Sequence, residues 1–576
     1  MISFDQIDWN KLWEEKMKIA SGVASWSGTG AERGISRWND AKNRPTRTGN
    51  DEYVEELLKK LTLGKDDSVL DIGCGDGLLS IPVAKKVKTV TALDVSKEVL
   101  EILKKAAFKK GVTNIEYLQA DWQTIKPVDD ISLHDIVIAS RCLGMFDLKE
   151  ELIKINKIAK KLVYLTRIVK EDDWISPKIY ELLRKQFKPL PNYYYVYNLL
   201  YQLGIRARID YISAEVEEKY KSINQAINVW RWKLNGLTDE EEKELRNFLE
   251  NNLINDRNNN WSTGLFDCKW ALISWVPKEY KDKYKLSQRE QKEFVNPNFD
   301  WNHIWNNFNR DRIYNDKSTS AHKWDAFAEH FNRGVTKDWK NKNSYINQLI
   351  KKLEVNAHDT VLDIGCASGG ISIPIAPKAK SVTAIDISGD MIAFFKKNIS
   401  KYSLGNINTI IGQWEDVATQ TSFPKHDIVI ASRCLSGPEL KEKLKKINKI
   451  ASKKVYFTWI TEISSLQKSV YQILNRKFKQ EPEYIYIFNL LHSMNINSKI
   501  DFIYCQNQES FASIDDAIER YQWILGDVTQ KEKEKLKNYF DKVYLKKEDG
   551  SIISPPNIES KWEWVVFSWE IGSEEG

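Results

Sequence analysis

The amino-acid sequence predicts an α/β protein with two tandem doubly wound parallel sheets, each followed by a helical tail and closing antiparallel strands. Three observations carry this prediction. Short apolar runs alternate with amphipathic stretches, a glycine-rich loop follows an apolar run, and a long stretch of the chain occurs twice. Alternating strands and helices indicate a parallel sheet, because parallel neighbours need a crossover connection, which is usually a helix.

The repeat defines the domain organisation. The segment VLDIGCGDGLLSIPVAKKVKTVTALDVS at residues 69–96 returns as VLDIGCASGGISIPIAPKAKSVTAIDIS at residues 361–388, and HDIVIASRCL begins at both His134 and His426. A chain of 576 residues is also longer than a single domain usually is. We therefore expect a first domain at residues 1–285, a linker at 286–298 and a second domain at 299–576.

Within the first copy the elements can be assigned in order. We expect strands at residues 68–72, 89–93, 115–118, 134–139 and 162–166, and helices at 78–85 and 97–110. Pro82 would have to lie in the first turn of its helix. Backbone N–H groups in that turn make no helical hydrogen bond, so the absence of an N–H in proline costs nothing there. After Pro191 a strand at 207–212, two polar helices and a strand at 271–276 resemble the closing part of the same sheet with a helical insertion.

Composition and charge exclude several classes of protein. The 86 basic and 80 acidic residues give a net charge of only +6, which makes nucleic acid an unfavoured partner. No apolar run reaches the roughly 18 residues of a membrane span, and the N-terminus lacks a signal-peptide pattern, so we expect a cytoplasmic protein without a membrane partner. The 6 Cys form no CxxC pair and the 7 His no ligand spacing, so no metal site is predicted.

The glycine loop is the sharpest local motif. Gly73, Gly75 and Gly77 follow a strand and open a helix, and Asp94 ends the next strand, where a carboxylate can bind ribose hydroxyls. This arrangement favours a nucleoside-type ligand over a purely structural turn. Leu78 breaks the dinucleotide pattern G-x-G-x-x-G, which disfavours a nicotinamide oxidoreductase. Asp71 and Asp363, which open the two loops, favour a ligand with a cationic amino-acid end.

The motifs DIGCGDG, ALDVS, QADW and HDIVIAS, in this order and spacing, resemble the class I S-adenosylmethionine-dependent methyltransferases, which have a Rossmann-like fold. The resemblance covers both halves and implies S-adenosylmethionine as the cofactor. It implies that the loop from Asp71 to Gly77 holds the methionine part and that Asp94 holds the ribose. Asp121 would contact the adenine amino group, Trp122 would pack near the ring, and Ser140 would stand at the strand end that faces the methyl group.

The second copy keeps most of these positions. The matching cofactor-binding candidates are Asp363, Gly365, Gly369, Asp386, Gln413, Trp414 and Ser432. Ala367 replaces Gly75, which would place a methyl group at the tightest point of the loop, and Gln413 replaces Asp121 without its charge. The second copy also has KWDAFAEHFNRG at residues 323–334, which is similar to the family's cofactor-covering helix, whereas Pro45 interrupts a shorter segment in the first.

Arg141 and Arg433 are the candidates for contact with the methyl acceptor. Both follow the strand HDIVIAS at its carboxyl end, where an arginine could clamp a carboxylate or phosphate or could instead pair with a neighbouring acid. Transfer from a sulfonium depends largely on alignment of donor and acceptor, so no catalytic residue is assigned.

The predicted function is S-adenosylmethionine-dependent methyl transfer to a small-molecule acceptor. Two alternatives stay open: one catalytic half with a structural or regulatory pseudo-methyltransferase half, or a protein- or RNA-directed methyltransferase. Because two similar domains in one chain commonly pack as homodimers do, we expect a monomer with pseudo-two-fold domain pairing.

Overall fold

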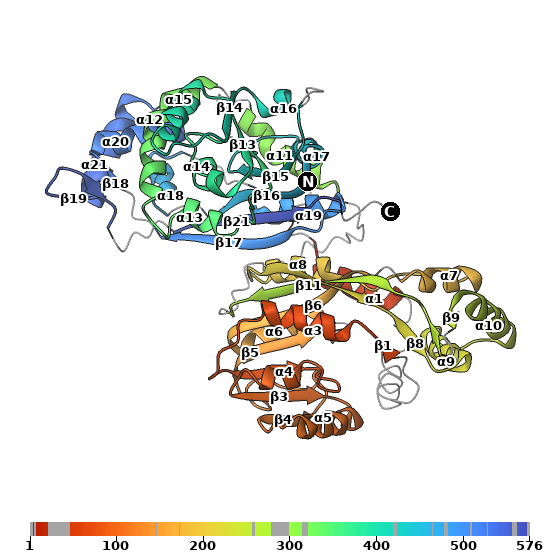
Figure 1. The fold of residues 1–576 in the computed structure, drawn as a ribbon. Helices are drawn as coiled ribbons and strands as arrows, with labels where there is room; N and C mark the ends of the chain where they lie inside the picture. The colour runs from red at the N-terminus through yellow and green to blue at the C-terminus, as the bar shows by residue number, and fades with distance from the viewer. Residues whose placement is uncertain are drawn as a thin grey trace. The chain divides into compact units, whose positions relative to one another are not determined.

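The computed structural model describes residues 4, 7–20, 46–143, 147–171, 173–255, 260–277, 299–313, 321–418, 423–462, 465–476, 482–506, 510–526, 528–555 and 561–572. The chain divides into two compact units, residues 2–296 and 297–576, and each is described by itself (Figure 1). The predicted linker at 286–298 lies outside the described residues. Within the described ranges, no helix combines the length and hydropathy that crossing a bilayer requires.

The first unit is built on a mixed sheet with the strand order β4-β3-β2-β5-β6-β11-β7. Its parallel part contains β2 (Ser68–Ile72), β3 (Thr89–Asp94), β4 (Ile115–Gln119), β5 (His134–Ser140) and β6 (Ala159–Glu171). The closing strands β7 (Arg208–Val216) and β11 (Phe266–Trp275) pair antiparallel, as predicted. β6, β7 and β11 are longer than their apolar runs, because antiparallel pairing continues beyond the buried residues.

The second unit repeats this topology with the order β14-β13-β12-β15-β16-β21-β17. Its parallel strands are β12 (Thr360–Ile364), β13 (Ser381–Asp386), β14 (Ile407–Ile411), β15 (His426–Ser432) and β16 (Ala451–Glu462). β17 (Lys499–Gln506) and β21 (Lys561–Glu570) close it antiparallel. The fold is therefore a class I, Rossmann-like α/β fold occurring twice, as the repeat predicted.

The crossover helices cover the sheets. In the first unit these helices and their neighbours are α1 (Trp9–Ile19), α3 (Asn50–Lys60), α4 (Ser80–Ala84), α5 (Lys97–Lys109), α6 (Leu148–Ile158), α7 (Ile175–Leu182) and α8 (Tyr193–Gln202). Pro82 lies within the first turn of α4, as expected, although the helix begins two residues later than predicted. Ser96 caps α5 by accepting a hydrogen bond from the Val99 backbone N–H, and the helix buries Leu100 and Leu103 against the sheet.

The second unit has corresponding helices, and two of them, α12 and α16, have no counterpart in the described part of the first. They are α11 (Trp301–Ile313), α12 (Ala321–Asp338), α13 (Tyr345–Ile350), α14 (Ser372–Ile375), the 3-10 turn η5 (Ala376–Lys378), α15 (Gly389–Ile399), α16 (Trp414–Val417), α17 (Leu440–Ile450), α18 (Ser465–Ile473) and α19 (Tyr484–Ser493). The long helix α12 contains the predicted cofactor-covering segment 323–334. The segment of the first unit that would match it falls largely within residues 21–45, outside the described ranges.

Each unit carries a small helical subdomain with its own apolar core. In the first, α9 (Ile223–Lys233) and α10 (Asp239–Asn252) pack with α7, beside the short strands β1 (Thr46–Arg47), β8 (Glu218–Tyr220), β9 (Ile254–Asn255) and β10 (Trp261–Ser262) (Figure 1). In the second, α20 (Ile514–Leu525) and α21 (Gln530–Val543) accompany β18 (Ser510–Phe511), β19 (Leu545–Lys546) and β20 (Ile552–Ile553). Thr238 and Thr529 form capping boxes at the starts of α10 and α21, which fixes where both helices begin.

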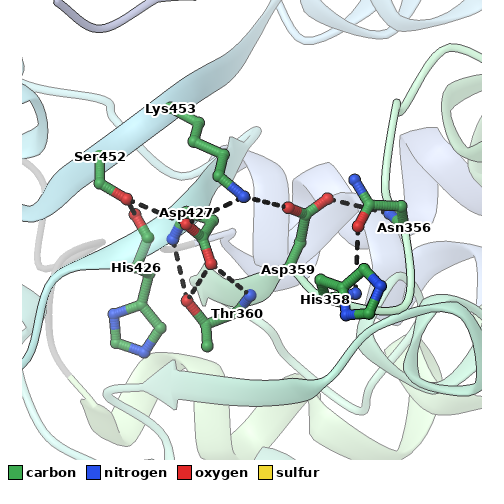
Figure 2. Close-up of polar contacts among 8 residues, drawn as sticks. All are labelled: Asn356, His358, Asp359, Thr360, His426, Asp427, Ser452 and Lys453. Atoms are coloured by element: carbon green, nitrogen blue, oxygen red, sulfur yellow. Dashed lines mark hydrogen bonds and ion pairs between the residues drawn. The ribbon is translucent and has the colours of Figure 1, made fainter.

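A polar network ties the strand starts together at the amino edge of the second sheet (Figure 2). The Asp427 carboxylate accepts hydrogen bonds from the backbone N–H and the hydroxyl of Thr360, each at 2.9 Å, and pairs with the Lys453 ammonium at 3.2 Å. Lys453 also pairs with Asp359 at 2.8 Å. Asp135, Ser68, Lys161 and Asp67 repeat this network in the first unit. His426 begins β15 at this edge, so it lies away from the carboxyl ends of the strands.

Candidate functional site

The glycine loop follows β2 and β12 in a left-handed backbone conformation. Gly73, Gly75 and Gly77 have φ angles of 65°, 57° and 86°. A Cβ on Gly73 would lie 2.6 Å from the Cys142 Cβ, and one on Gly77 would lie 1.9 Å from the Leu103 Cδ1. These two positions therefore require glycine for close packing as well as for backbone conformation.

The prediction that the methyl group of Ala367 lies at the tightest point of the loop was wrong. A Cβ at Gly75, the equivalent position, would have no heavy atom within 4 Å, so the middle of the loop is open rather than tight. The tight positions of the second loop are Gly365, where a Cβ would lie 2.5 Å from the Cys434 Cβ, and Gly369, where it would lie 2.6 Å from the Phe395 Cδ2. Ala367 meets only the cost of a positive φ, which is 49°.

The acids at the ends of β3 and β13 are locked to the glycine loops. The Asp94 carboxylate accepts hydrogen bonds from the backbone N–H groups of Gly75 at 3.0 Å and Ser96 at 2.9 Å. Asp386 accepts the equivalent bonds from Ala367 at 2.8 Å and Ser388 at 2.9 Å. Each carboxylate is thus held beside its loop, with further acceptor capacity for ligand hydroxyls.

The acids that open the loops are more deeply buried. Ser80 donates a hydrogen bond to Asp71 at 2.5 Å, and Ser372 donates the equivalent bond to Asp363 at 2.5 Å. Burial raises the pKa of both Asp71 and Asp363 to about 7. The Asp363 Oδ1 is buried and has no hydrogen-bond partner among the residues that the structure describes. Such a carboxyl suits a cationic donor that enters from outside the chain.

In the second unit all the predicted residues except Gly369 border one cavity of about 520 Å³. Its lining includes Asp363, Gly365, Asp386, Gln413, Trp414, Ser432 and Arg433, together with Ala367. The helix α12 supplies an apolar wall of Trp324, Phe327, Phe331 and Val335. Gly369 is not part of this lining and instead packs closely on Phe395. The carboxyl ends of the parallel strands therefore meet at a cavity large enough for a nucleoside ligand.

In the first unit Asp121 and Trp122 follow the end of β4. Asp121 is exposed, and its Oδ1 accepts a hydrogen bond from the Gln123 backbone N–H at 2.9 Å. Trp122 is buried, with the Lys154 ammonium 5.0 Å from the centre of its ring. Asp121 is thus exposed directly after the carboxyl end of β4, and Trp122 beside it is buried.

A hydroxyl cluster that the sequence interpretation missed supports the end of each central strand. The Tyr345 hydroxyl lies 2.8 Å from the Ser432 hydroxyl and 2.6 Å from that of Thr458. Thr458 in turn accepts a hydrogen bond from the Arg433 backbone N–H at 3.2 Å. The first unit repeats this cluster with Tyr53, Ser140, Thr166 and Arg141. The sequence could have indicated this cluster, because the Tyr and the Thr both recur at equivalent positions of the repeat.

The same cluster determines how the two candidate arginines are held. Arg141 and Arg433 have φ angles of 56° and 60°, a conformation that is unusual for a residue other than glycine. Their guanidinium groups lie over the rings of Tyr53 and Tyr345, 4.2 Å and 4.3 Å from the ring centres. The sequence left open a clamp on the acceptor or a pair with a neighbouring acid. In the structure the Arg433 guanidinium instead contacts the faces of the Tyr345 and Trp564 rings, and Arg433 also borders the cavity.

Comparison with known proteins gives the family of the two halves. Residues 69–162 and residues 355–543 each match a family model described as a methyltransferase domain. The sheet topology, the glycine loop and the acid-tipped strands define the same class. The chain belongs to the class I methyltransferases, with one methyltransferase domain in each half, and is an enzyme of that class.

Individual relatives match parts of the chain. An uncharacterized protein of Haemophilus influenzae is 28% identical over 232 residues, which is 40% of this chain and 82% of that protein. A protein of Methanocaldococcus jannaschii named "Probable cobalt-precorrin-6B C(15)-methyltransferase (decarboxylating)" is 38% identical over 103 residues, 18% of this chain and 56% of its own length. Among solved structures, Haemonchus contortus phosphoethanolamine N-methyltransferase 1 is 12% identical, with 98% of both chains covered and a TM-score of 0.25.

Proposed function

We propose that each domain binds S-adenosylmethionine and transfers its methyl group to a small-molecule acceptor. The observation that carries this proposal is the 520 Å³ cavity of the second domain, which joins the glycine loop, Asp386 and Trp414 at the carboxyl edge of the sheet. Parallel α/β sheets bind ligands at this edge. The proposal extends to the first domain because its loop, Asp94 and Tyr53 cluster have the same local geometry.

The side chains of the second cavity fit the parts of this cofactor. The buried Asp363 Oδ1 can accept a hydrogen bond from the ammonium of the methionine part. Asp386 can accept hydrogen bonds from ribose hydroxyls, and Gln413 can bond the adenine edge while Trp414 packs near the ring. In the first domain Asp71, Asp94, Asp121 and Trp122 have the same roles.

The bound cofactor supplies a methyl group already activated on a sulfonium. The protein's task is then to hold the acceptor in line with that carbon and to exclude water. Alignment of this kind can supply on the order of 7–11 kcal/mol of the acceleration. Ser432 and Arg433, at the end of β15, are placed to border the reacting groups.

A small-molecule acceptor is favoured over RNA by the charge of the chain. A relative from Aliivibrio fischeri, named as a 23S rRNA (uracil(1939)-C(5))-methyltransferase, matches over only 13% of this chain and 17% of its own length. The net charge of +6 is spread over 576 residues, without the large excess of basic groups that binding along a nucleic-acid backbone requires.

Isothermal titration calorimetry of the full chain with S-adenosylmethionine tests the proposal. We expect saturable binding that Asp386→Ala weakens at the second site and Asp94→Ala at the first, by at least tenfold each. Asp129→Ala, which removes an exposed carboxylate away from the loops, is the matched control. Absence of binding heat with both the cofactor and its demethylated product would overturn the proposal.

Stoichiometry separates this proposal from a chain with one catalytic and one pseudo-enzyme half. The second alternative has some support, because Ala367 and Gln413 depart from the pattern of the first copy. Two equivalents of cofactor per chain exclude a half that has lost the cofactor. One equivalent, abolished by only one of the two aspartate substitutions, identifies which half retains it.

A further inference from the structure

A second cavity of about 450 Å³ adjoins the proposed cofactor cavity in the second domain. Phe327, Phe331, Val335, Arg433 and Arg520 line both, so the two spaces share a wall. The rest of the second cavity is formed by the C-terminal half of α12, the start of α20, and residues of β18 and of the turn before β20. Its volume suits a small molecule, and its position places such a molecule beside Arg433.

This cavity has an excess of positive charge. Its lining contains the cations Arg333, Lys337, Arg433 and Arg520 and the acids Asp338 and Asp516. His330 adds no charge near neutral pH. Its ordinary pKa of 6.5 already lies below pH 7, and burial lowers that pKa further. Asp516 pairs with Arg333 at 3.3 Å, which balances one acid against one cation, so the positive excess comes from Lys337, Arg433 and Arg520 against Asp338.

Aromatic rings orient two of the arginines. The Arg520 guanidinium lies 4.9 Å from the centre of the Phe327 ring and 5.1 Å from that of Trp523. Arg433 lies over Tyr345 at 4.3 Å. A guanidinium that contacts a ring through its face keeps its N–H donors in the plane, and that planar fork matches a carboxylate or phosphate.

The other two cations come from successive turns of α12. Arg333 and Lys337 are four residues apart and therefore lie on one face of the helix. Lys337 donates a hydrogen bond to the Ser510 hydroxyl at 2.6 Å, which directs its ammonium across the cavity toward β18. Cations thus approach the space from α12, α20 and the end of β15.

We propose that this second cavity binds the methyl acceptor of the second domain, and that this acceptor is an anionic small molecule bearing a carboxylate or phosphate group. The proposal rests on the proposed function for the identity of the neighbouring cavity. Arg520 and Arg433 bind the oxyanion, Lys337 adds to the positive field at the entrance, and Arg333 holds Asp516 in an ion pair that keeps this acid from opposing the anion.

The first domain lacks a central part of this arrangement. Arg520 stands seven residues after the cap Ser513, and the residue seven positions after the equivalent cap Ser222 is Val229. Val229 is 7% exposed and packs in the apolar core of its subdomain. Among the residues that the structure describes, the arginine that this site needs on α20 is therefore found in the second domain and not in the first.

Four probes that share a phenyl ring and differ in charge test the charge preference. We would titrate the full chain, with and without S-adenosylhomocysteine, with benzoate, phenyl phosphate, benzamide and benzamidine. We expect benzoate or phenyl phosphate to bind at least tenfold more tightly than the neutral and cationic probes. The tighter of the two anions identifies the preferred oxyanion. Equal binding of all four probes would overturn the proposal.

Variants then locate the binding. Arg520→Gln, and separately the double variant Arg333→Gln with Lys337→Gln, should each weaken anion binding at least tenfold. Arg231→Gln, which removes an arginine from the equivalent helix α9, is the matched control and should have no effect. Anion binding unchanged in both test variants would place it elsewhere and refute the proposal.

The cofactor titration keeps the two proposals separate. Arg333 and Lys337 border only the second cavity, so the double variant should bind S-adenosylmethionine as the unaltered chain does. If the cofactor binds and the probes show no charge preference, only this inference fails. If the anions bind with the expected variant pattern but the cofactor does not, the proposed function fails while the oxyanion site stands.

Discussion

At the scale of single residues, the three glycines of the first loop have unequal roles. Gly77→Ala would combine a φ of 86° with a Cβ 1.9 Å from the Leu103 side chain, whereas Gly75→Ala would meet no heavy atom within 4 Å. We expect Gly75→Ala to lower the free energy of unfolding by about 1 kcal/mol, and Gly77→Ala to lower it by about 3 kcal/mol or more. Urea unfolding measures both, and equal losses would contradict this assignment.

The buried carboxyl of Asp363 leads to a prediction about protons. Its pKa is raised to about 7, so at pH 6.5 it is mostly protonated in the free protein. A bound ammonium favours the charged form and lowers that pKa, so cofactor binding should release roughly half a proton or more at the second site. Calorimetry in two buffers with different ionisation heats measures this release. Asp363→Asn should abolish the proton release that comes from the second site. Proton uptake instead of release would refute the role of Asp363 as the acceptor of the cofactor's ammonium.

At the scale of elements, the network in Figure 2 joins the starts of β12, β15 and β16. Burial raises the pKa of Asp427, but hydrogen bonds from Thr360 and Lys453 outweigh this effect and lower the pKa to about 2, below its unfolded value near 3.8. A lowered folded-state pKa means that the stabilisation is complete above pH 4 and is lost as the pH falls toward 2. We expect Asp427→Asn to cost about 1 kcal/mol at pH 7, since the pair is partly exposed.

The pH dependence distinguishes this effect from a general loss of packing. In denaturant unfolding, the difference between Asp427→Asn and the unaltered chain should shrink as the pH falls from 5 to 2. Asp129→Asn, on an exposed turn, should show no such trend. A difference that stays constant over this range would show that the Asp427 charge is not responsible.

The elements were predictable from the sequence to a greater extent than the contacts at the site. Apolar runs and the repeat predicted the strands, because burial of a parallel strand leaves a continuous apolar segment. The carboxyl edge and its acids followed from the topology. The stacking of Arg433 on Tyr345 did not, because residues 345 and 433 meet only when α13 packs across the end of β15. Ala367 was misjudged because sequence shows which loop position is small but not which position faces open space.

At the scale of the whole molecule, duplication has preserved one set of contacts and changed another. The loops, the acids that tip β3 and β13, and the tyrosine–serine–threonine clusters have nearly the same distances in both domains. The subdomains differ, because Val229 and Arg520 occupy equivalent positions on α9 and α20. Taken with the two proposals, the same loop contacts and the different residues on α9 and α20 predict that the two domains methylate different molecules.

This difference between the domains can be tested by removing one proposed cofactor site at a time. Asp94→Ala leaves only the second cofactor site intact, and Asp386→Ala leaves only the first. We would supply each variant with S-adenosylmethionine and cell-extract metabolites separated by anion exchange, and measure formation of the demethylated cofactor. The Asp94→Ala chain should respond to strongly retained, anionic fractions, because Arg433 and Arg520 of its intact domain provide the oxyanion site. The Asp386→Ala chain should not respond to those fractions, because Val229 stands where that site needs an arginine. If both variants respond to the same fractions, the two domains share one acceptor, and the difference between α9 and α20 has no role in choosing it.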